Sequence, residues 1–287
     1  MEILNELLKT YTFHEIAKQL NIAHGTVKRW MDNQSVPDSY TFELTKLTGG
    51  TIDYSNFSSK QKDQFFTPKA VAELCIKKFH EVMETHRLDV DDYKFIEPAA
   101  GAGAFYSILP DDTIGMDIEP RFDNVMRQDF LLWKPSDTTG KYIVAGNPPF
   151  GLRGQLALKF INHAATFADH IFFILPQLFE SDGKGSPRKR VKGYNLIHSE
   201  KLTTNFEVPG GKDTKVNCVF QVWSKLTDNP EYHIITPDNS VAEVFSLSAG
   251  GTPSSTRNQT MWDKCDIYLP STCYGKENMK AYKTMWE

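Results

Sequence analysis

The sequence has few of the features that mark secreted, membrane-spanning or metal-binding proteins. Its 287 residues include only four cysteines, none in C-x-x-C spacing: Cys75, Cys218, Cys265 and Cys273. This scatter argues against a disulfide framework or a zinc site, so we predict no bound metal. No apolar run approaches the roughly 20 residues of a membrane span, and the first residues lack a secretory signal's basic and then apolar layout. We therefore expect a cytoplasmic protein.

The chain also lacks an excess of positive charge. It carries 32 Lys and Arg against 36 Asp and Glu, a formal net charge of −4. A surface covered with phosphate contacts is usually basic overall, but nucleic-acid binding needs only a local basic patch. The charge balance therefore neither requires nor excludes a nucleic-acid partner.

Residues 1–50 are predicted to form a small all-helical module. The segment 13–20 places its apolar residues on one helical face, a turn follows at 21–22, and a second helix runs from near 23 to Trp30. The pattern resembles a helix-turn-helix, whose second helix enters the DNA major groove. That helix would present His24, Thr26, Lys28 and Arg29. The alternative is a three-helix bundle that serves only for docking or dimerisation.

The rest of the chain divides into a linker at 51–60, a catalytic domain at 61–225 and a small C-terminal extension at 226–287, which could contact substrate. The domain alternates short β-like runs with helices at 68–85 and 155–167, which is typical of a doubly wound parallel α/β sheet. We predict seven strands, at 94–97, 113–117, 124–128, 142–146, 170–175, 203–208 and 216–223. The extension contains β-like runs at 232–235 and 241–246.

A glycine-rich turn follows the first predicted strand. The run from Phe95 to Phe105 is a strand ending in Glu97, then Pro98, then a turn with Gly101 and Gly103. Such a turn brings open backbone to the carboxyl edge of the sheet, where ligands bind in this architecture. The third glycine of the dinucleotide fingerprint is missing, which argues against NAD.

Acidic residues end the next two strands. Asp117 is placed to accept hydrogen bonds from the ribose hydroxyls of an adenosine ligand, with a turn-capping role as the alternative. Asp129 could accept from the adenine amino group of such a ligand, and Phe130 could pack on its ring.

The most informative motif is Asn147-Pro148-Pro149-Phe150, which directly follows the buried strand 142–146. Two consecutive prolines end the strand and fix the backbone, and they offer carbonyls without competing amide hydrogens. The tetrad lies where a site belongs in a parallel sheet.

Taken in order, these motifs resemble the amino-methyltransferases that act on DNA, and most closely the N6-adenine enzymes. The resemblance covers about 61–225 and implies a Rossmann-like class I methyltransferase fold, S-adenosylmethionine as cofactor and DNA as partner. It implies cofactor contacts from Phe66, Thr67, Pro68, Glu97, Pro98, Gly101, Gly103, Asp117, Ile118, Asp129 and Phe130, and catalysis by Asn147, Pro148, Pro149 and Phe150. Open alternatives are methylation of cytosine N4, an RNA base or a protein glutamine, or a DNA-binding regulator on a methyltransferase scaffold.

The chemistry of the tetrad supports methyl transfer to a planar nitrogen. The Asn147 side-chain oxygen and the Pro148 carbonyl would accept from the amino group and localise its lone pair for in-line attack. Phe150 would stack on a base swung out of the duplex. For a second stacking aromatic, Phe206 and Phe220 are the candidates.

A basic run follows the predicted strand 170–175. It contains Lys184, Arg188, Lys189, Arg190 and Lys192. Because it leaves the same sheet edge as the tetrad, we expect a phosphate-contacting loop, with an ordinary solvated surface as the alternative.

Overall fold

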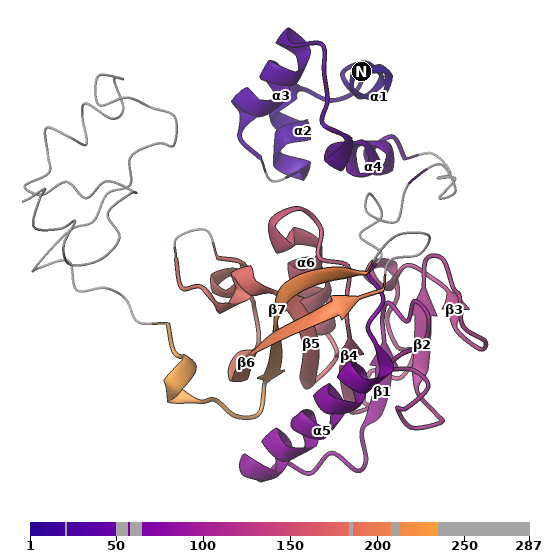
Figure 1. Cartoon of the computed structure of the whole chain (residues 1–287), viewed down its shortest axis with the longest axis vertical. Helices are drawn as coiled ribbons and strands as arrows, with labels where there is room; N and C mark the ends of the chain where they lie inside the picture. Colours follow the sequence, from indigo (N-terminus) through magenta and orange to yellow (C-terminus); the bar gives the residue numbers. More distant parts are fainter. Residues whose placement is uncertain (21, 50–56, 58–64, 184–185, 208–212, 235–287) are drawn as a thin grey trace, which may run out of the picture. The chain divides into compact units, whose positions relative to one another are not determined.

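A computed structural model describes residues 1–20, 22–49, 57, 65–183, 186–207 and 213–234 (Figure 1). The predicted linker lies almost wholly outside these residues, and so do Lys184 and nearly all of the predicted C-terminal extension. The part of the extension that is described contains one short 3-10 helix, η6 (Pro230–Tyr232).

The N-terminal residues form four helices: α1 (Glu2–Leu7), α2 (Phe13–Gln19), α3 (His24–Asp32) and α4 (Asp38–Leu47). A capping box between Thr12 and Glu15 starts α2, because each side chain bonds the other residue's main-chain amide. Ile16, Val27 and Trp30 are buried together in a core that belongs to this module alone. Residues 1–47 thus bury their apolar faces against one another.

The predicted catalytic domain is built on one seven-stranded sheet in the order β3-β2-β1-β4-β5-β7-β6. All neighbouring pairs from β3 to β5 are parallel, and β7 runs antiparallel to both β5 and β6. The strands are β1 (Lys94–Glu97), β2 (Ile114–Asp117), β3 (Met126–Arg127), β4 (Tyr142–Gly146), β5 (His170–Pro176), β6 (Asn195–Phe206) and β7 (Thr214–Ser224).

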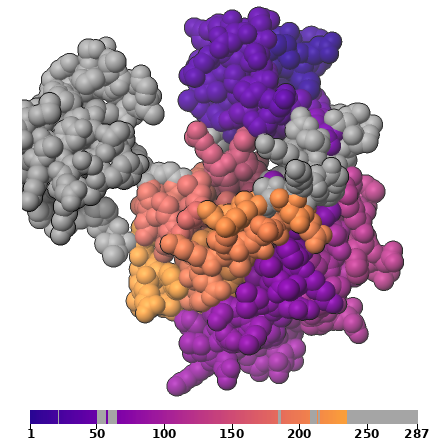
Figure 2. All heavy atoms as spheres, in the orientation of Figure 1, coloured from indigo at the N-terminus to yellow at the C-terminus, as the bar shows by residue number. Residues whose placement is uncertain are grey.

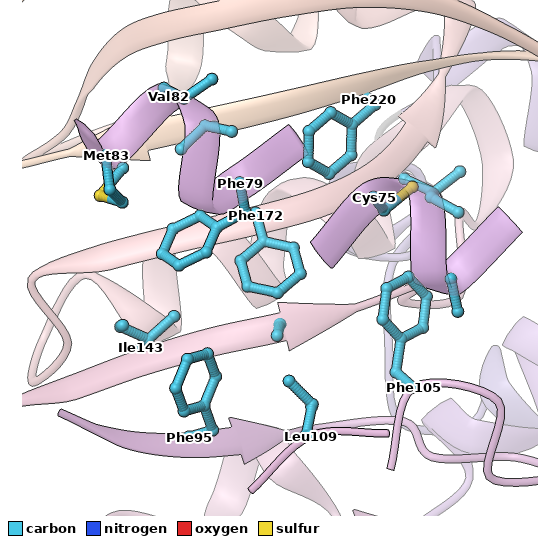
Figure 3. Close-up of a cluster of buried hydrophobic side chains, with 14 of the residues drawn as sticks. Cys75, Phe79, Val82, Met83, Phe95, Phe105, Leu109, Ile143, Phe172 and Phe220 are labelled. Atoms are coloured by element: carbon cyan, nitrogen blue, oxygen red, sulfur yellow. The ribbon is translucent and has the colours of Figure 1, made fainter. Parts of the chain in front are cut away.

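Two helices cover opposite faces of this sheet, α5 (Lys69–Thr85) on one and α6 (Gln155–Ala164) on the other (Figure 1). Strand β5 is buried on both faces. Phe172 packs with Phe79 of α5 and with Phe220 (Figure 3). Phe173 belongs to the core beneath α6. The Phe79 and Phe172 rings stack with centroids 4.4 Å apart. In the space-filling view, α5 and the β6–β7 pair form neighbouring parts of one outer face (Figure 2).

The predicted Rossmann-like class I methyltransferase sheet is confirmed, and β1 and β4 match their predicted bounds. The prediction for β6 was wrong at its start, which lies at Asn195 rather than Thr203. Strand β6 is an edge strand with many polar residues, and its pairing shifts register between Leu196 and His198, so its alternation is weak in the sequence. Helix α6 ends at Ala164, before the predicted 167.

His170, the first residue of β5, is completely buried beside the Tyr93 ring. No described residue hydrogen-bonds either of its ring nitrogens. Burial lowers the pKa of His170 to about 4; the charge of Asp169 opposes this shift, and the charge of Lys225 adds slightly to it. The folded protein therefore holds this imidazole neutral at pH values where the unfolded chain protonates it.

We predict that this histidine weakens the fold in acid. The contribution of His170 to the free energy of unfolding is fully present above the ordinary pKa of 6.5 and is lost as the pH falls toward 4, by roughly 3 kcal/mol in total. His170→Phe should remove that part of the pH dependence, as measured by urea unfolding between pH 7.5 and 4.5, whereas the exposed His80→Phe should leave it unchanged. An unaltered pH dependence in His170→Phe would contradict this account.

Candidate functional site

The carboxyl ends of β1, β2 and β4 meet at the middle of the sheet. From β1 the strand order runs outward to β2 and β3 on one side, and from β4 it runs outward to β5 on the other, so the switch point lies between β1 and β4. Crevices at such switch points are where open α/β sheets bind ligands. Glu97 ends β1, Asp117 ends β2, and Asn147 follows β4 directly. Three motifs far apart in the sequence are thereby brought to one edge.

The glycine-rich turn is tied to β2 by main-chain and side-chain bonds. The Ala100 amide donates to the Met116 carbonyl at 3.0 Å, and the Gly101 amide donates to Asp117 Oδ2 at 2.8 Å. The Glu119 amide donates to Asp117 Oδ1 at 2.7 Å. Asp117 thus caps the turns on both sides of it. Each carboxylate oxygen retains a second lone pair, so this role is compatible with hydrogen bonds to a ligand.

Aromatic rings lie directly on the two glycines of the turn. Gly101 has φ +53°, and a Cβ there would come 3.1 Å from the Phe66 ring. Gly103 has φ +82°, and a Cβ there would collide with Phe122 at 2.3 Å. Both positions require glycine for their conformation and for the space. The Arg121 guanidinium lies 5.4 Å from the centre of the Phe66 ring.

A cavity opens between the glycine turn, the end of β2 and the tetrad. Of the predicted site residues, those that line it are Phe66, Pro98, Gly101, Asp117, Ile118, Asp129, Phe130, Asn147 and Pro149. The other lining residues from the part of the chain that forms the sheet were not predicted: Phe65, Ala99, Glu119, Leu131, Leu156 and Phe160. The remaining predicted cofactor and catalytic residues are outside the lining: Thr67, Pro68, Glu97, Gly103, Pro148 and Phe150.

Asp129 and Phe130 both line this cavity. Asp129 Oδ1 accepts from the Leu131 amide at 2.9 Å, which starts a short 3-10 turn, and the residue is otherwise exposed. Phe130 is almost fully buried against Phe160 and His163, so only a small part of its ring faces the cavity.

The Asn147 side chain is held by the main chain of another segment. Its Nδ2 donates to the Phe65 carbonyl at 3.1 Å, while its Oδ1 is buried and has no partner among the described residues. The Phe65 segment is itself fixed by a β-bridge, because Phe66 and Glu207 exchange two hydrogen bonds of 2.9 and 3.0 Å. A carbonyl can only accept, so this contact turns the amide oxygen away from Phe65.

Phe150 is half-buried at the start of the connection to α6. Its carbonyl accepts from the Leu156 and Ala157 amides, both at 3.2 Å, which fixes the end of the tetrad to the first turn of the helix. Neither Phe206 nor Phe220 can be the second stacking aromatic, since both are buried in the core beneath α5. Large aromatic residues on strands are core residues more often than site residues, and the sequence alone did not separate the two roles.

The basic loop after β5 is partly structural. Arg188 is buried, forms an ion pair with Asp182 at 2.9 Å and hydrogen-bonds the Tyr232 carbonyl. These partners occupy the guanidinium, so Arg188 is not free to bind phosphate. Arg190 donates to Gln155 Oε1 at 2.9 Å, and Lys189 and Lys192 are exposed.

Glu97 is a carboxyl group buried beneath the tetrad. A Cβ on Gly146 would lie 3.4 Å from Glu97 Oε1, and Oε2 has no partner among the described residues. Burial, with a further contribution from the charge of Asp117, raises the pKa of Glu97 well above its usual value, against a hydrogen bond from the Tyr106 amide. Glu97 is therefore neutral in a range where an exposed glutamate is ionised.

We predict that Glu97→Gln stabilises the fold at neutral pH. A carboxyl whose pKa is raised by folding contributes stability below its ordinary pKa of 4.5 and loses it as the pH rises toward the folded value. Glutamine keeps the shape and does not titrate, so its advantage should grow as the pH rises from 4 to 8. Urea unfolding would show this, with the exposed Glu73→Gln as control; a variant less stable than wild type at pH 8 would refute it.

Within the described ranges, no group of three or more His, Cys, Asp or Glu side chains could hold a metal ion. No helix of the described residues has the length and apolar character to cross a membrane.

Comparison with solved structures finds methyltransferase folds. A candidate RNA methyltransferase of Pyrococcus horikoshii matches with a TM-score of 0.41 and 19% identity over 57% of this chain and 87% of that one. The type IIG restriction endonuclease BpuSI matches with a TM-score of 0.39 and 16% identity over 57% and 28%. The magnesium protoporphyrin IX methyltransferase of Synechocystis, solved with bound S-adenosylmethionine, matches with a TM-score of 0.38 and 12% identity over 66% and 98%.

No family model and no curated protein matches the sequence. At identities and TM-scores this low, the structural likenesses carry no argument about substrate. The fold assignment therefore rests on strand order and direction, and the function must be argued from the residues at the sheet edge.

Proposed function

We propose that the protein is an S-adenosylmethionine-dependent methyltransferase that methylates the exocyclic N6 amino group of adenine in DNA. The observation that carries this proposal is the Asn147 amide, whose nitrogen is engaged by the Phe65 carbonyl while its buried oxygen is left without a partner among the described residues. An unpartnered buried acceptor is costly and calls for a donor from a ligand.

The residues along the crevice fit the cofactor. Gly101 lines the cavity without a side chain, and Asp117 keeps lone pairs for ribose hydroxyls. Asp129 lines the same cavity and is proposed to accept from the adenine amino group of the cofactor. The cofactor would supply an electrophilic methyl group on a sulfonium; the nitrogen–carbon bond would form as the sulfur–carbon bond breaks, the thioether would leave, and the methylated nitrogen would release one proton to water. Phe66, Thr67, Pro68, Glu97, Pro98, Gly103, Ile118 and Phe130 remain the proposed surrounding residues.

The tetrad provides acceptors to the substrate nitrogen. Asn147 Oδ1 and the Pro148 carbonyl each take one N–H of the amino group, which weakens its conjugation with the ring and directs its lone pair at the methyl group. A carbonyl substituent in the same place would face two acceptors with no hydrogen to offer. The site therefore favours an amine over a keto group. Pro149 fixes the backbone, and Phe150 stacks on the base.

The helical module favours DNA over the other substrates. On α3, His24, Lys28 and Arg29 are exposed and Thr26 is half-exposed, as a recognition helix would require. Lys189 and Lys192 provide exposed cations in the catalytic domain, next to Arg190. Cytosine N4, an RNA base or a protein glutamine present the same amide-like nitrogen, so product analysis separates them.

The proposal predicts methyl transfer to DNA. Labelled S-adenosylmethionine and unmethylated duplex DNA should yield N6-methyladenine, identified by nucleoside mass spectrometry. Asn147→Ala should lower kcat by about 10²-fold or more, because it removes an acceptor that acts in the transition state, while cofactor binding stays unchanged. If the product is N4-methylcytosine, the substrate base is cytosine instead of adenine. No methylated nucleoside from wild-type protein, despite cofactor binding, would overturn the proposal.

The proposal also predicts a role for α3. Replacing Lys28 and Arg29 together by alanine should weaken DNA binding and reduce the slope of log affinity against log salt by about 2, for two lost phosphate contacts. The affinity for S-adenosylmethionine should not change. Lys9→Ala, an exposed lysine of the same module that pairs with Glu6, is the matched control. Equal affinity and slope in both variants would show that α3 does not bind DNA.

A further inference from the structure

The connection between the tetrad and α6 has an unusual backbone. Three of its four residues lie in the left-handed region: Gly151 at φ +64°, Arg153 at φ +53° and Gly154 at φ +70°. Glycine adopts this conformation readily, but arginine rarely does. A side chain is therefore present at a position where the backbone favours glycine.

The surrounding contacts hold Arg153 in this conformation. Its carbonyl accepts from Gln155 Nε2 at 3.5 Å, and Gln155 Oε1 in turn accepts from Arg190 at 2.9 Å. Gly154 is buried so tightly that a Cβ would lie 3.0 Å from the Phe179 ring. Strained residues persist where neighbours determine their conformation, and they concentrate at functional sites.

The Arg153 side chain is free to meet a ligand. The residue is exposed, and within the described ranges no acidic or aromatic side chain pairs with its guanidinium. No Asp or Glu occurs between Asp137 and Asp169 in a chain whose net charge is −4. Lys159 is exposed on α6, one turn beyond Gln155. The segment that leaves the tetrad is thus locally cationic.

We propose that Arg153 binds a backbone phosphate of the substrate DNA strand, beside the base held by Asn147 and Phe150. The inference rests on the proposed function, because it takes the substrate to be DNA. Arg153 is the third residue after Phe150, so their Cα atoms are at most about 11 Å apart. The guanidinium therefore reaches the phosphates that flank the target nucleotide. Its planar fork suits two phosphate oxygens at once.

The left-handed backbone makes a clean test possible. Arg153→Gly in the full-length protein removes the side chain and relieves the backbone, so we expect the variant to stay folded. We expect the affinity for a labelled adenine-containing duplex to fall roughly tenfold and the salt slope to decrease by about 1. S-adenosylmethionine binding should match wild type, and Tm should not decrease.

Arg87→Gly is the matched control. Arg87 is also exposed and lies at φ +54°, but it follows α5 at the amino edge of the sheet. The Arg87→Gly variant loses the same charge and the same backbone restriction as Arg153→Gly. We expect its DNA affinity and salt slope to be unchanged. Arg153→Asn, whose side chain tolerates the left-handed region, should reproduce the Arg153→Gly loss if the glycine variant is poorly folded.

The outcomes separate the two proposals. If wild type binds and methylates DNA and Arg153→Gly and Arg153→Asn both behave like Arg87→Gly, the phosphate contact is refuted and the proposed function stands. If wild-type protein binds S-adenosylmethionine but neither binds nor methylates DNA, the proposed substrate is refuted, and the phosphate contact with it. A loss of affinity and slope confined to Arg153 variants supports the contact.

Discussion

The hydrogen bond from Asn147 Nδ2 to the Phe65 carbonyl gives the candidate site its polarity. Without it, the amide could turn either its nitrogen or its oxygen toward the cavity. With it, the nitrogen is turned toward Phe65 and the oxygen away from it, and that oxygen is buried without a described partner. The Phe65 carbonyl is in turn positioned by the bridge between Phe66 and Glu207, at the end of β6. The orientation of one side chain after β4 therefore depends on the antiparallel end of the sheet.

The part of the site beside the glycine-rich turn depends on limiting the repulsion between the carboxyl groups of Glu97 and Asp117. Glu97 and Asp117 end adjacent strands, and two ionised carboxylates there would repel each other in a poorly solvated space. Asp117 accepts hydrogen bonds from two main-chain amides, whereas Glu97 is buried and its pKa is raised well above its usual value. The glycine turn is thereby fixed to β2, and the crevice beside it stays open for a ligand.

The sequence predicts those parts of the site that lie at the ends of parallel strands. Asn147 and Asp117 follow apolar runs directly, so their shared edge could be inferred from topology. Phe65 contributes through its main-chain carbonyl. Every residue type has such a carbonyl, so the sequence does not reveal this contact. Arg188 reads as a surface cation, but contacts with Asp182 and Tyr232 from distant segments bury it. In the sequence, only the neighbouring glycines hint at the left-handed backbone of Arg153. Strand β6 is a polar edge strand with weak alternation, so its first residue could not be predicted.

The hydrogen bond from Asn147 Nδ2 to the Phe65 carbonyl acts as a clamp on the amide, and the pH dependence of Asn147→Asp tests this clamp most directly. A protonated aspartic acid can donate to the Phe65 carbonyl and still offer a carbonyl oxygen to the substrate, whereas the ionised form directs a carboxylate oxygen at the Phe65 carbonyl and is repelled. We predict that kcat/KM for methyl transfer, as a ratio of variant to wild type, rises as the pH falls, because asparagine does not titrate. A ratio that stays constant with pH, or that rises toward alkaline pH, would contradict the clamp as the basis of the site.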